Sequence, residues 1–399
     1  YGSGGPAGDL NRYNGNFKRG MDVNAIRAWE ITAGSPDVIV AVLDGGIDFK
    51  HPDLVSNIWI NPGETAENGI DDDNNGYIDD IYGFRFEDGP EGSGSGNIHP
   101  LNHGTHCAGI IAAASNNNTG IAGIAGGDGT LPGVKIMICQ IAHPANPSEY
   151  PGNYDDMQFG TKAAESFLYA AENGAVIASN SWGGVDNESY RLAIRYFVEN
   201  AGLDEHGTQT GPMRGGIVIF SAGNESSESP QYPAAWDETI SVAWLDPDFG
   251  LHRNGTTGSN FGSWIDLSAP GGHTASGRFG NESQGGIYST VVSGNWTGGM
   301  NYAFRQGSSM AAPHVAGVAA LLVSHFGGVS SGLTSAKVRQ MLETSAYPVD
   351  NFNSSNYNEK TGHGLIDAYC ALTYSGTHGT TLPGQIVTPD VSRNMRELM

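Results

Sequence analysis

Short apolar runs alternate with stretches of helical periodicity along much of the chain. The apolar runs at 38–43, 134–141, 175–178 and 216–220 have the length of buried strands. Helices are predicted at 159–172 and 190–200, between these runs. Strands that are apolar on both faces and alternate with helices are typical of a parallel sheet buried on both sides. We therefore predict an α/β, three-layer fold with a mostly parallel central sheet covered by helices on both faces.

The C-terminal half has a different pattern. Residues 245–305 are rich in Gly, Ser, Asn and Thr, and alternation at 264–267 and 286–290 predicts short strands. A long helix is predicted from Ser309 to Phe326, with Pro313 in its opening turns, where a missing N–H costs least. A further helix at 334–343 has Thr334 as its N-cap. We predict an N-terminal arm at 1–20, one large α/β domain at 21–375 and a C-terminal tail at 376–399.

Composition limits the classes of partner. The 399 residues include 59 Gly, with 42 acidic against 19 basic side chains and a net charge of −23. This acidity argues against nucleic acid and anionic membranes as partners. No run approaches the ~20 apolar residues of a membrane span. The three Cys lie in apolar stretches, which favours buried thiols over a disulfide.

Three polar residues stand where small-residue turns meet predicted strands or helices. Asp44 follows the strand at 38–43, His103 precedes an apolar helix at 108–114, and Ser309 follows Gly307 and Ser308. Alone, each has an ordinary explanation: a turn residue, a metal ligand or a helix N-cap. Together, Asp, His and Ser are the three parts of an activated hydroxyl nucleophile. Chemistry is expected there because active sites of α/β sheets lie at the carboxyl ends of strands.

These windows resemble the signatures of the subtilisin-like serine peptidases, the subtilases. The matching segments are Val-Leu-Asp44-Gly-Gly-Ile, His103-Gly-Thr-His-Cys-Ala-Gly and Gly-Ser-Ser309-Met-Ala-Ala-Pro, in the family's order. The chain has Ser308 where the family usually has Thr, and Gly45 where it usually has Ser or Thr. The resemblance implies a serine endopeptidase that cleaves proteins through an acyl-enzyme, with Ser309 as nucleophile, His103 as base and Asp44 orienting the base.

The resemblance also implies further site residues. Asn224, in Ser-Ala-Gly-Asn-Glu after the strand at 216–220, matches the family's oxyanion-stabilising Asn. A substrate-binding edge is implied at Ser181, Trp182, Gly183 and Gly184, although a Trp after a strand is equally typical of packing. Cys107 resembles the thiol-containing branch of the family. A His base and an oxyanion Asn together predict activity at neutral to alkaline pH.

An acidic segment predicts calcium binding. Five aspartates lie within residues 71–80, and the spacing of Asp71, Asp73 and Asn75, followed by Gly76, reproduces the first half of an EF-hand-type loop. Without an ion these carboxylates would repel one another; a disordered acidic loop is the alternative. The predicted ligands are Asp71, Asp73, Asn75, the carbonyl of Tyr77, and Asp79 or Asp80 in place of the usual Glu.

A second calcium site is predicted with less support from the residues. Asp53, in His51-Pro-Asp-Leu, and Asn117, in an Asn-rich loop, resemble a strand-end Asp and a loop that share a calcium ion in the family. Bound calcium at either site would couple stability to calcium concentration.

The resemblance carries expectations about the protein's setting. We expect a secreted or cell-surface monomer that acts on proteins or peptides and was once joined to its own removed propeptide. Two other functions stay open: an inactive subtilase fold kept as a binding module, and a calcium-dependent adhesion module. Both predict binding without hydrolysis.

Overall fold

The computed structural model describes residues 20–89, 92–144, 157–160, 162–184, 186–275, 285–294, 301–349 and 358–374. The predicted arm, apart from Gly20, and the predicted tail lie outside these residues. An eight-stranded sheet has the order β12-β9-β8-β7-β1-β4-β2-β3. All neighbours in it run parallel except β2 and β3. Its strands are β1 (Ile39–Asp44), β2 (Gly83–Gly89), β3 (Gly92–Ser95), β4 (Lys135–Gln140), β7 (Ile177–Asn180), β8 (Ile217–Ser221), β9 (Ile240–Leu245) and β12 (Leu267–Pro270).

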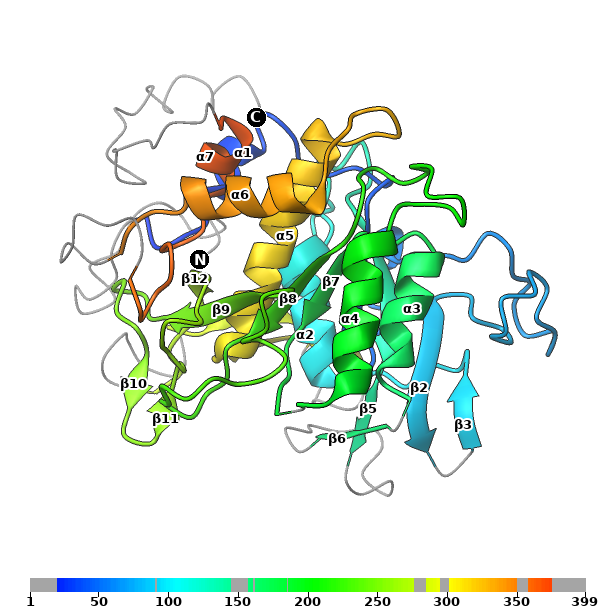
Figure 1. Ribbon diagram of the computed structural model, residues 1–399, viewed down its shortest axis with the longest axis horizontal. Coiled ribbons are helices and arrows are strands. Elements are labelled where there is room, and N and C mark those ends of the chain that lie inside the picture. The colour runs from blue at the N-terminus through cyan, green and yellow to red at the C-terminus, as the bar shows by residue number, and fades with distance from the viewer. Residues whose placement is uncertain are drawn as a thin grey trace.

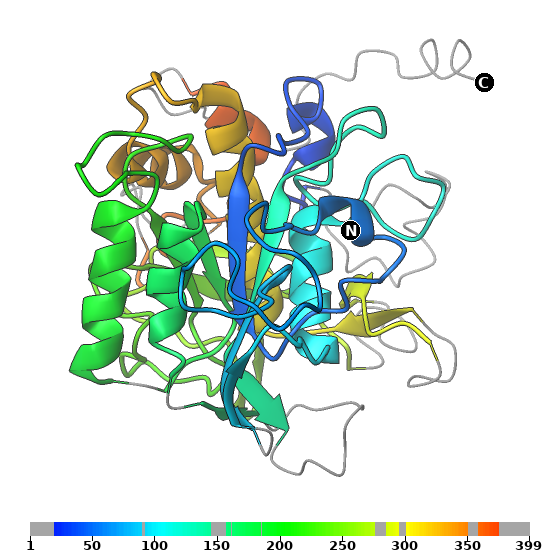
Figure 2. The same ribbon diagram turned by 90° about the vertical axis from the view of Figure 1, so that its right-hand side faces the viewer.

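Helices cover both faces of this sheet (Figures 1 and 2). Helices α2 (Asn102–Ala112) and α5 (Ser308–Phe326) pack on one face, and α3 (Glu165–Glu172) and α4 (Glu188–Asn200) on the other. Alternate side chains of one strand enter different cores. On β1, Val40 and Val42 join the core with α2 and α5, whereas Ala41 and Leu43 join the core with α3 and α4. The predicted three-layer α/β fold is confirmed.

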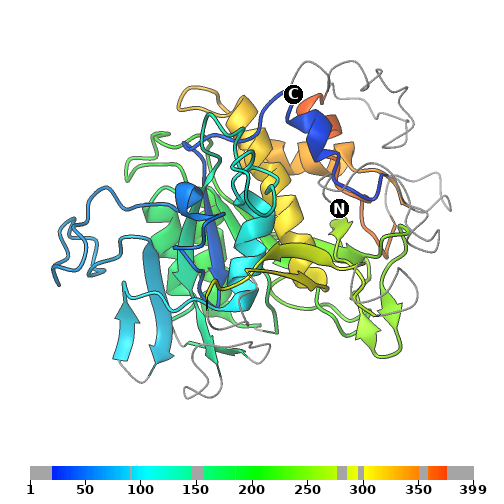
Figure 3. The ribbon, with the colours of Figure 1, turned by 180° about the vertical axis from the view of Figure 1, so that it is seen from behind.

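Smaller elements complete the chain. Short helices are α1 (Ala25–Ala28), the 3₁₀ turn η2 (Val55–Asn57), α6 (Ser335–Ser345) and α7 (Ala368–Leu372). Two-stranded ribbons pair β5 (Ala142–Pro144) with β6 (Met157–Phe159), β10 (Arg253–Asn254) with β11 (Thr257–Gly258), and β13 (Ile287–Thr290) with β14 (Tyr302–Arg305). Figure 3 shows the β13–β14 ribbon crossing the outer side of α2, where His106 Nε2 donates to the carbonyls of Ile287 and Ala303.

Several predicted boundaries are wrong. The helix predicted from residue 159 begins at Glu165, because Phe159 pairs with Ala142 in a ribbon. The helix expected from residue 108 begins at Asn102, and therefore contains His103. Only the last residue of the strand predicted at 264–267 belongs to β12. By contrast, Thr334 caps α6 as predicted, accepting a hydrogen bond from Lys337 N.

Burial accounts for two features of the composition. By length and composition α5 could span a membrane, but 83% of its apolar window is buried inside the fold, as expected of a core helix. All three Cys are free thiols: Cys107 and Cys139 are buried, and Cys370 is half-buried. The prediction of buried thiols is confirmed for Cys107 and Cys139, and Cys370 is more exposed than predicted.

Candidate active site

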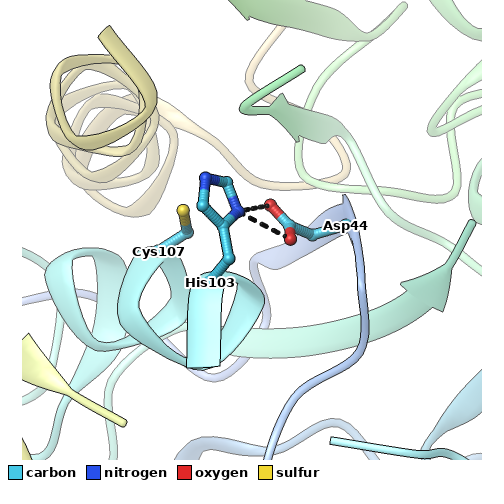
Figure 4. Close-up of side chains that lie close together, drawn as sticks. All are labelled: Asp44, His103 and Cys107. Atoms are coloured by element: carbon cyan, nitrogen blue, oxygen red, sulfur yellow. Dashed lines mark hydrogen bonds and ion pairs between the residues drawn. The ribbon is translucent and has the colours of Figure 1, made fainter. Parts of the chain in front are cut away.

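Asp44 and His103 form a buried hydrogen-bonded pair. Asp44 is the last residue of β1, and His103 lies in the first turn of α2. The Nδ1 atom of His103 is 2.9 Å from Oδ1 and 3.0 Å from Oδ2 of Asp44 (Figure 4), and the His103 and Asp44 side chains are 11% and 2% exposed. Because a carboxylate only accepts, Nδ1 carries the proton, and Nε2 is left as an acceptor facing away from Asp44.

A glycine lets this pair form. Gly104 passes so close to β1 that a Cβ there would collide with the carbonyl oxygen of Gly46 and lie 3.2 Å from the Asp44 side chain. The N–H of Gly45 donates to Asp44 Oδ1 at 2.7 Å, which fixes the carboxylate. The small residues of the two sequence windows therefore bring the strand end and the helix start into contact.

Ser309 lies in the first turn of α5, after a left-handed glycine. Gly307 has φ of 140° and precedes the helix at Ser308. Ser309 Oγ donates to the carbonyl oxygen of Ser181 at 3.2 Å, and Ser181 Oγ donates to the carbonyl oxygen of Ser309 at 2.8 Å. The described residues show no direct bond between Ser309 and His103; such bonds are often loose before substrate binds.

Asn224 lies beside the start of the same helix. Its Oδ1 accepts hydrogen bonds from both N and Oγ of Ser308, each at 2.9 Å. This assigns the oxygen of the amide, so Nδ2 is the free donor end. A Cβ on Gly307 would be 3.4 Å from Asn224 Oδ1 and 3.7 Å from both Asn224 Nδ2 and Ser309 N, so both nitrogens lie close to Gly307. The pair of N–H donors can stabilise a developing oxyanion.

Cys107 lies one helical turn after His103, and its surroundings make its thiol a poor nucleophile. Its Sγ is 3.4 Å from both Ser181 Oγ and the carbonyl oxygen of Ser309 (Figure 4 shows its place beside His103). Burial, followed by the nearby charge of Asp44, raises the pKa of the Cys107 thiol well above its ordinary value. The thiol therefore stays protonated at neutral pH, and a protonated thiol is a poor nucleophile and metal ligand.

The predicted substrate-binding segment follows β7 at the same end of the sheet. Ser181 is buried against Ser309, whereas Gly183 and Gly184 are exposed. The Trp182 indole is 6% exposed and packs edge-on against Phe220, with ring centroids 4.9 Å apart. Of the two roles open to this Trp, the structure shows packing.

The acidic loop gathers part of the predicted calcium set. Ligand oxygens of Asp71, Asp73 and Glu64 all lie within 4.8 Å of one another. Glu64 Oε1 accepts from Asp72 N at 2.8 Å, while its Oε2 is buried with no hydrogen-bond partner among the described residues. An orphaned carboxylate oxygen beside two aspartates fits a bound cation. The sequence pattern missed Glu64, because it precedes the EF-hand-like segment.

Other predicted ligands of this loop are held differently. The Asp79 carboxylate accepts from the N–H groups of Asn68 and Gly69, both at 3.0 Å. Asp80 is fully buried, accepts from Tyr169 Oη at 2.6 Å, and has its carboxyl pKa raised by burial. Asn75 Oδ1 accepts from Tyr77 N at 2.8 Å.

Asp53 and Asn117, the second predicted calcium pair, do meet. Asn117 Nδ2 donates to Asp53 Oδ1 at 2.7 Å, and Ile121 N and Tyr302 Oη donate to Asp53 Oδ2. Asn117 Oδ1 accepts from Thr119 N. Hydrogen bonds alone account for this buried carboxylate, so the second calcium ion stays a prediction.

Comparisons with known proteins show similarity over most of the chain. The model of the subtilase family, peptidase S8, matches residues 35–364. The chain is 30% identical to thermitase of Thermoactinomyces vulgaris over 353 residues, covering 88% of this chain and 94% of thermitase. It is 32% identical to fervidolysin of Fervidobacterium pennivorans over 376 residues, covering 92% of this chain and 45% of fervidolysin.

Two further comparisons extend this result. The crystal structure of fervidolysin, described as a keratinolytic enzyme related to subtilisin, superposes with a TM-score of 0.59 at 26% identity, over 92% of this chain and 46% of that one. A halolysin-like extracellular serine protease of Natrialba magadii is 28% identical over 359 residues, which are 90% of this chain and 52% of that protein. The chain thus spans about half the length of these two relatives.

Proposed function

Because the chain belongs to the subtilase family and is a serine-type endopeptidase, we propose that Ser309, His103, Asp44 and Asn224 carry out its chemistry. The observation that carries this assignment is the buried Asp44–His103 pair at the carboxyl end of β1, with the first turn of α5 at the same end of the sheet. Asp, His and Ser come from three separate windows of the chain, and their convergence favours catalysis over three unrelated turn residues.

In the proposed reaction, His103 Nε2 takes the proton from Ser309 Oγ as that oxygen attacks the carbonyl carbon of the peptide. Ser309 Oγ must first leave its hydrogen bond to the Ser181 carbonyl, a rotation of one side chain. Asp44 keeps the proton of His103 on Nδ1 and stabilises the imidazolium that forms. His103 then returns the proton to the leaving amine, and water releases the acyl group from Ser309 by the same route.

The oxyanion of the tetrahedral intermediate is proposed to lie between Asn224 Nδ2 and Ser309 N. Both nitrogens lie close to Gly307, and the N-terminus of α5 adds the positive end of its dipole. Asn224 is held in place because its oxygen accepts two hydrogen bonds from Ser308. The donors are therefore oriented before the charge develops.

The exposed backbone at Gly183 and Gly184 is proposed to pair with an extended substrate chain. Main-chain pairing gives affinity with little demand on sequence. Protein or peptide substrates follow from the family. Since the Natrialba relative is named as extracellular, we also propose that this protein is secreted or displayed at a cell surface, and that a propeptide accompanies its synthesis.

Labelling with a fluorophosphonate tests the assignment of the nucleophile. We expect one phosphonyl group per chain, attached to Ser309 and located by mass spectrometry of peptides, because only an activated hydroxyl displaces fluoride rapidly. His103→Ala should abolish labelling, since it removes the base. Stoichiometric labelling of Ser308, or of any other Ser, would contradict the assignment, and no labelling at all would favour an inactive binding module.

We further propose that the acidic loop binds one calcium ion through Glu64, Asp71 and Asp73, with Asn75 and the carbonyl of Tyr77 as further oxygen donors. Asp79 and Asp80 do not belong to this group of three carboxylates and are proposed to shape the loop through their own hydrogen bonds. The support is the close approach of three carboxylates and the unpartnered Oε2 of Glu64. Oxygen-only donors of this kind suit calcium.

Calcium removal should lower stability. At a calcium concentration 100-fold above Kd, binding to the folded state alone stabilises by about 2.7 kcal/mol. Adding a chelator in the Ser309→Ala background, where self-digestion is absent, should therefore lower Tm in calorimetry. Glu64→Gln and Asp73→Asn should remove most of this dependence, while Asp237→Asn, an exposed control, should keep it. If chelation lowered Tm equally in the Ser309→Ala protein and in all three further variants, the proposed calcium site would be wrong.

A further inference from the structure

We propose that Asp246, His252 and His273 bind a zinc ion in the interior of the protein, at the carboxyl end of β9. The three side chains come from separate segments: Asp246 directly follows β9, His252 precedes β10, and His273 follows β12. They are buried, with 0%, 0% and 6% of their surface exposed. None of them belongs to the catalytic set or to the acidic loop.

The potential ligand atoms of the three side chains converge. Asp246 Oδ1 is 2.6 Å from His252 Nδ1 and 3.2 Å from His273 Nδ1. The two Nδ1 atoms are themselves 3.2 Å apart. One oxygen and two nitrogens therefore form a closed triangle in which every pair is within contact distance.

With Asp246 as a carboxylate, no placement of protons on the two Nδ1 atoms makes all three contacts of this triangle attractive. If both Nδ1 atoms carry protons and donate to Asp246, two N–H groups face each other. If only His252 Nδ1 carries one, the lone pair of His273 Nδ1 faces the carboxylate oxygen. At least one contact is repulsive in either arrangement, and inside a protein such repulsion is weakly screened. A cation at the centre of the triangle would instead attract the lone pairs of all three ligand atoms.

The donor set and its dimensions favour zinc. Two imidazole nitrogens and one carboxylate oxygen suit Zn²⁺, whereas calcium takes oxygen ligands. Zinc bonds of 2.0–2.1 Å in a tetrahedron separate neighbouring ligand atoms by about 3.3 Å. Two sides of the triangle already have this length, so binding requires only that Asp246 and His252 move slightly apart.

The surroundings hold the ligands in place. The His252 ring is stacked on the Trp244 indole, with centroids 3.9 Å apart and planes at 7°. Trp244 Nε1 in turn donates to the carbonyl oxygen of Gly272, next to His273. An indole thus connects the two loops that carry the imidazoles, and its stacking holds the His252 ring in place.

The same loops support the catalytic residues. Gly307 N donates to the carbonyl oxygen of Gly271 at 3.0 Å, and Thr274 Oγ1 donates to Gln306 Oε1 at 2.8 Å. Residues 306 and 307 directly precede the turn that carries Ser309. Zinc joining Asp246, His252 and His273 would therefore stabilise the backbone on which the nucleophile depends, without touching substrate.

The test measures metal content directly. Ser309→Ala protein is exposed to ZnCl₂, passed through gel filtration and analysed by mass spectrometry for metals. We expect one zinc per chain, retained with calcium present, and none after His273→Asn or Asp246→Asn. The exposed His206→Ala variant is the matched control and should keep its zinc. His103→Ala should also keep it, which separates this site from Asp44, His103 and Cys107.

Cobalt substitution supplies a readout that does not depend on variants folding. Co²⁺ added to the Ser309→Ala protein should give the intense visible absorption of a four-coordinate site, and one equivalent of zinc should displace it. Far-UV circular dichroism checks that each variant is folded. Absence of stoichiometric zinc and of a cobalt spectrum, or zinc content unchanged by His273→Asn, would overturn the proposal and leave a buried hydrogen-bonded cluster.

Discussion

Replacement of Ser309 by Ala is expected to lower kcat about 10⁶-fold, the loss found for the nucleophile of subtilisin, a relative of this chain. The change removes the only atom proposed to attack the peptide carbonyl. It leaves the packing almost intact, because among the described residues the lost hydroxyl bonds only to the Ser181 carbonyl. Hydrolysis of a fluorogenic peptide under saturating substrate measures kcat directly.

Two further measurements make this prediction specific. Ser330→Ala, in the exposed loop after α5, should retain full activity. Tm of the Ser309→Ala protein should stay within a few degrees of the wild type, because no buried group loses more than one partner. A loss below tenfold would show that Ser309 is not the nucleophile. A large drop in Tm would instead assign the lost activity to unfolding.

Asn224→Leu is expected to lower kcat about 10²–10³-fold with little change in KM, a range that was also measured in subtilisin. Leu has the same branching as Asn and no donor, so the oxyanion loses one of its two proposed hydrogen bonds. The ground-state carbonyl bears little charge, so substrate binding should hardly change. Separate determination of kcat and KM is therefore the informative measurement.

Ser308→Ala is the matched control for Asn224. It removes the hydroxyl that donates to Asn224 Oδ1 at 2.9 Å but keeps the Ser308 N–H that donates to the same oxygen. Asn224 Nδ2 should stay in place, and we expect less than a tenfold loss of kcat. If Ser308→Ala lost as much activity as Asn224→Leu, Asn224 would act through the position of the helix start and not on the oxyanion.

The catalytic set could be predicted from sequence because each member stands at the end of a strand or the start of a helix. Asp44, His103 and Ser309 are flanked by glycines whose small size allows close approach, and this requirement leaves a local signature. The beginning of α2 was harder to locate, since His103 and its neighbours have no strong apolar periodicity. Its start at Asn102 depends on contacts with β1 that no short window contains.

Residues joined only by the fold could not be predicted. Strand β9 is fully buried and is followed by a polar segment. Its carboxyl end lies beside that of β12 because the two strands pair, and this neighbourhood brings the proposed zinc ligands together. Asp246 and His273 are far apart in sequence and meet because the ends of those two strands are neighbours. Glu64 likewise reaches Asp73 because Gly63 leaves room: a Cβ on residue 63 would lie only 2.6 Å from Asp73 Cβ.

The central position of β1 has a consequence for the rate of folding. This strand pairs with β4, which begins at Lys135, and with β7, which begins at Ile177. Closing such long loops before any pairing energy is gained makes folding slow. Incompletely folded chains would then be open to proteolysis by folded, active molecules of the same enzyme. The lifetime of the active enzyme would therefore depend on the rate at which folded molecules unfold, more than on the equilibrium free energy of unfolding.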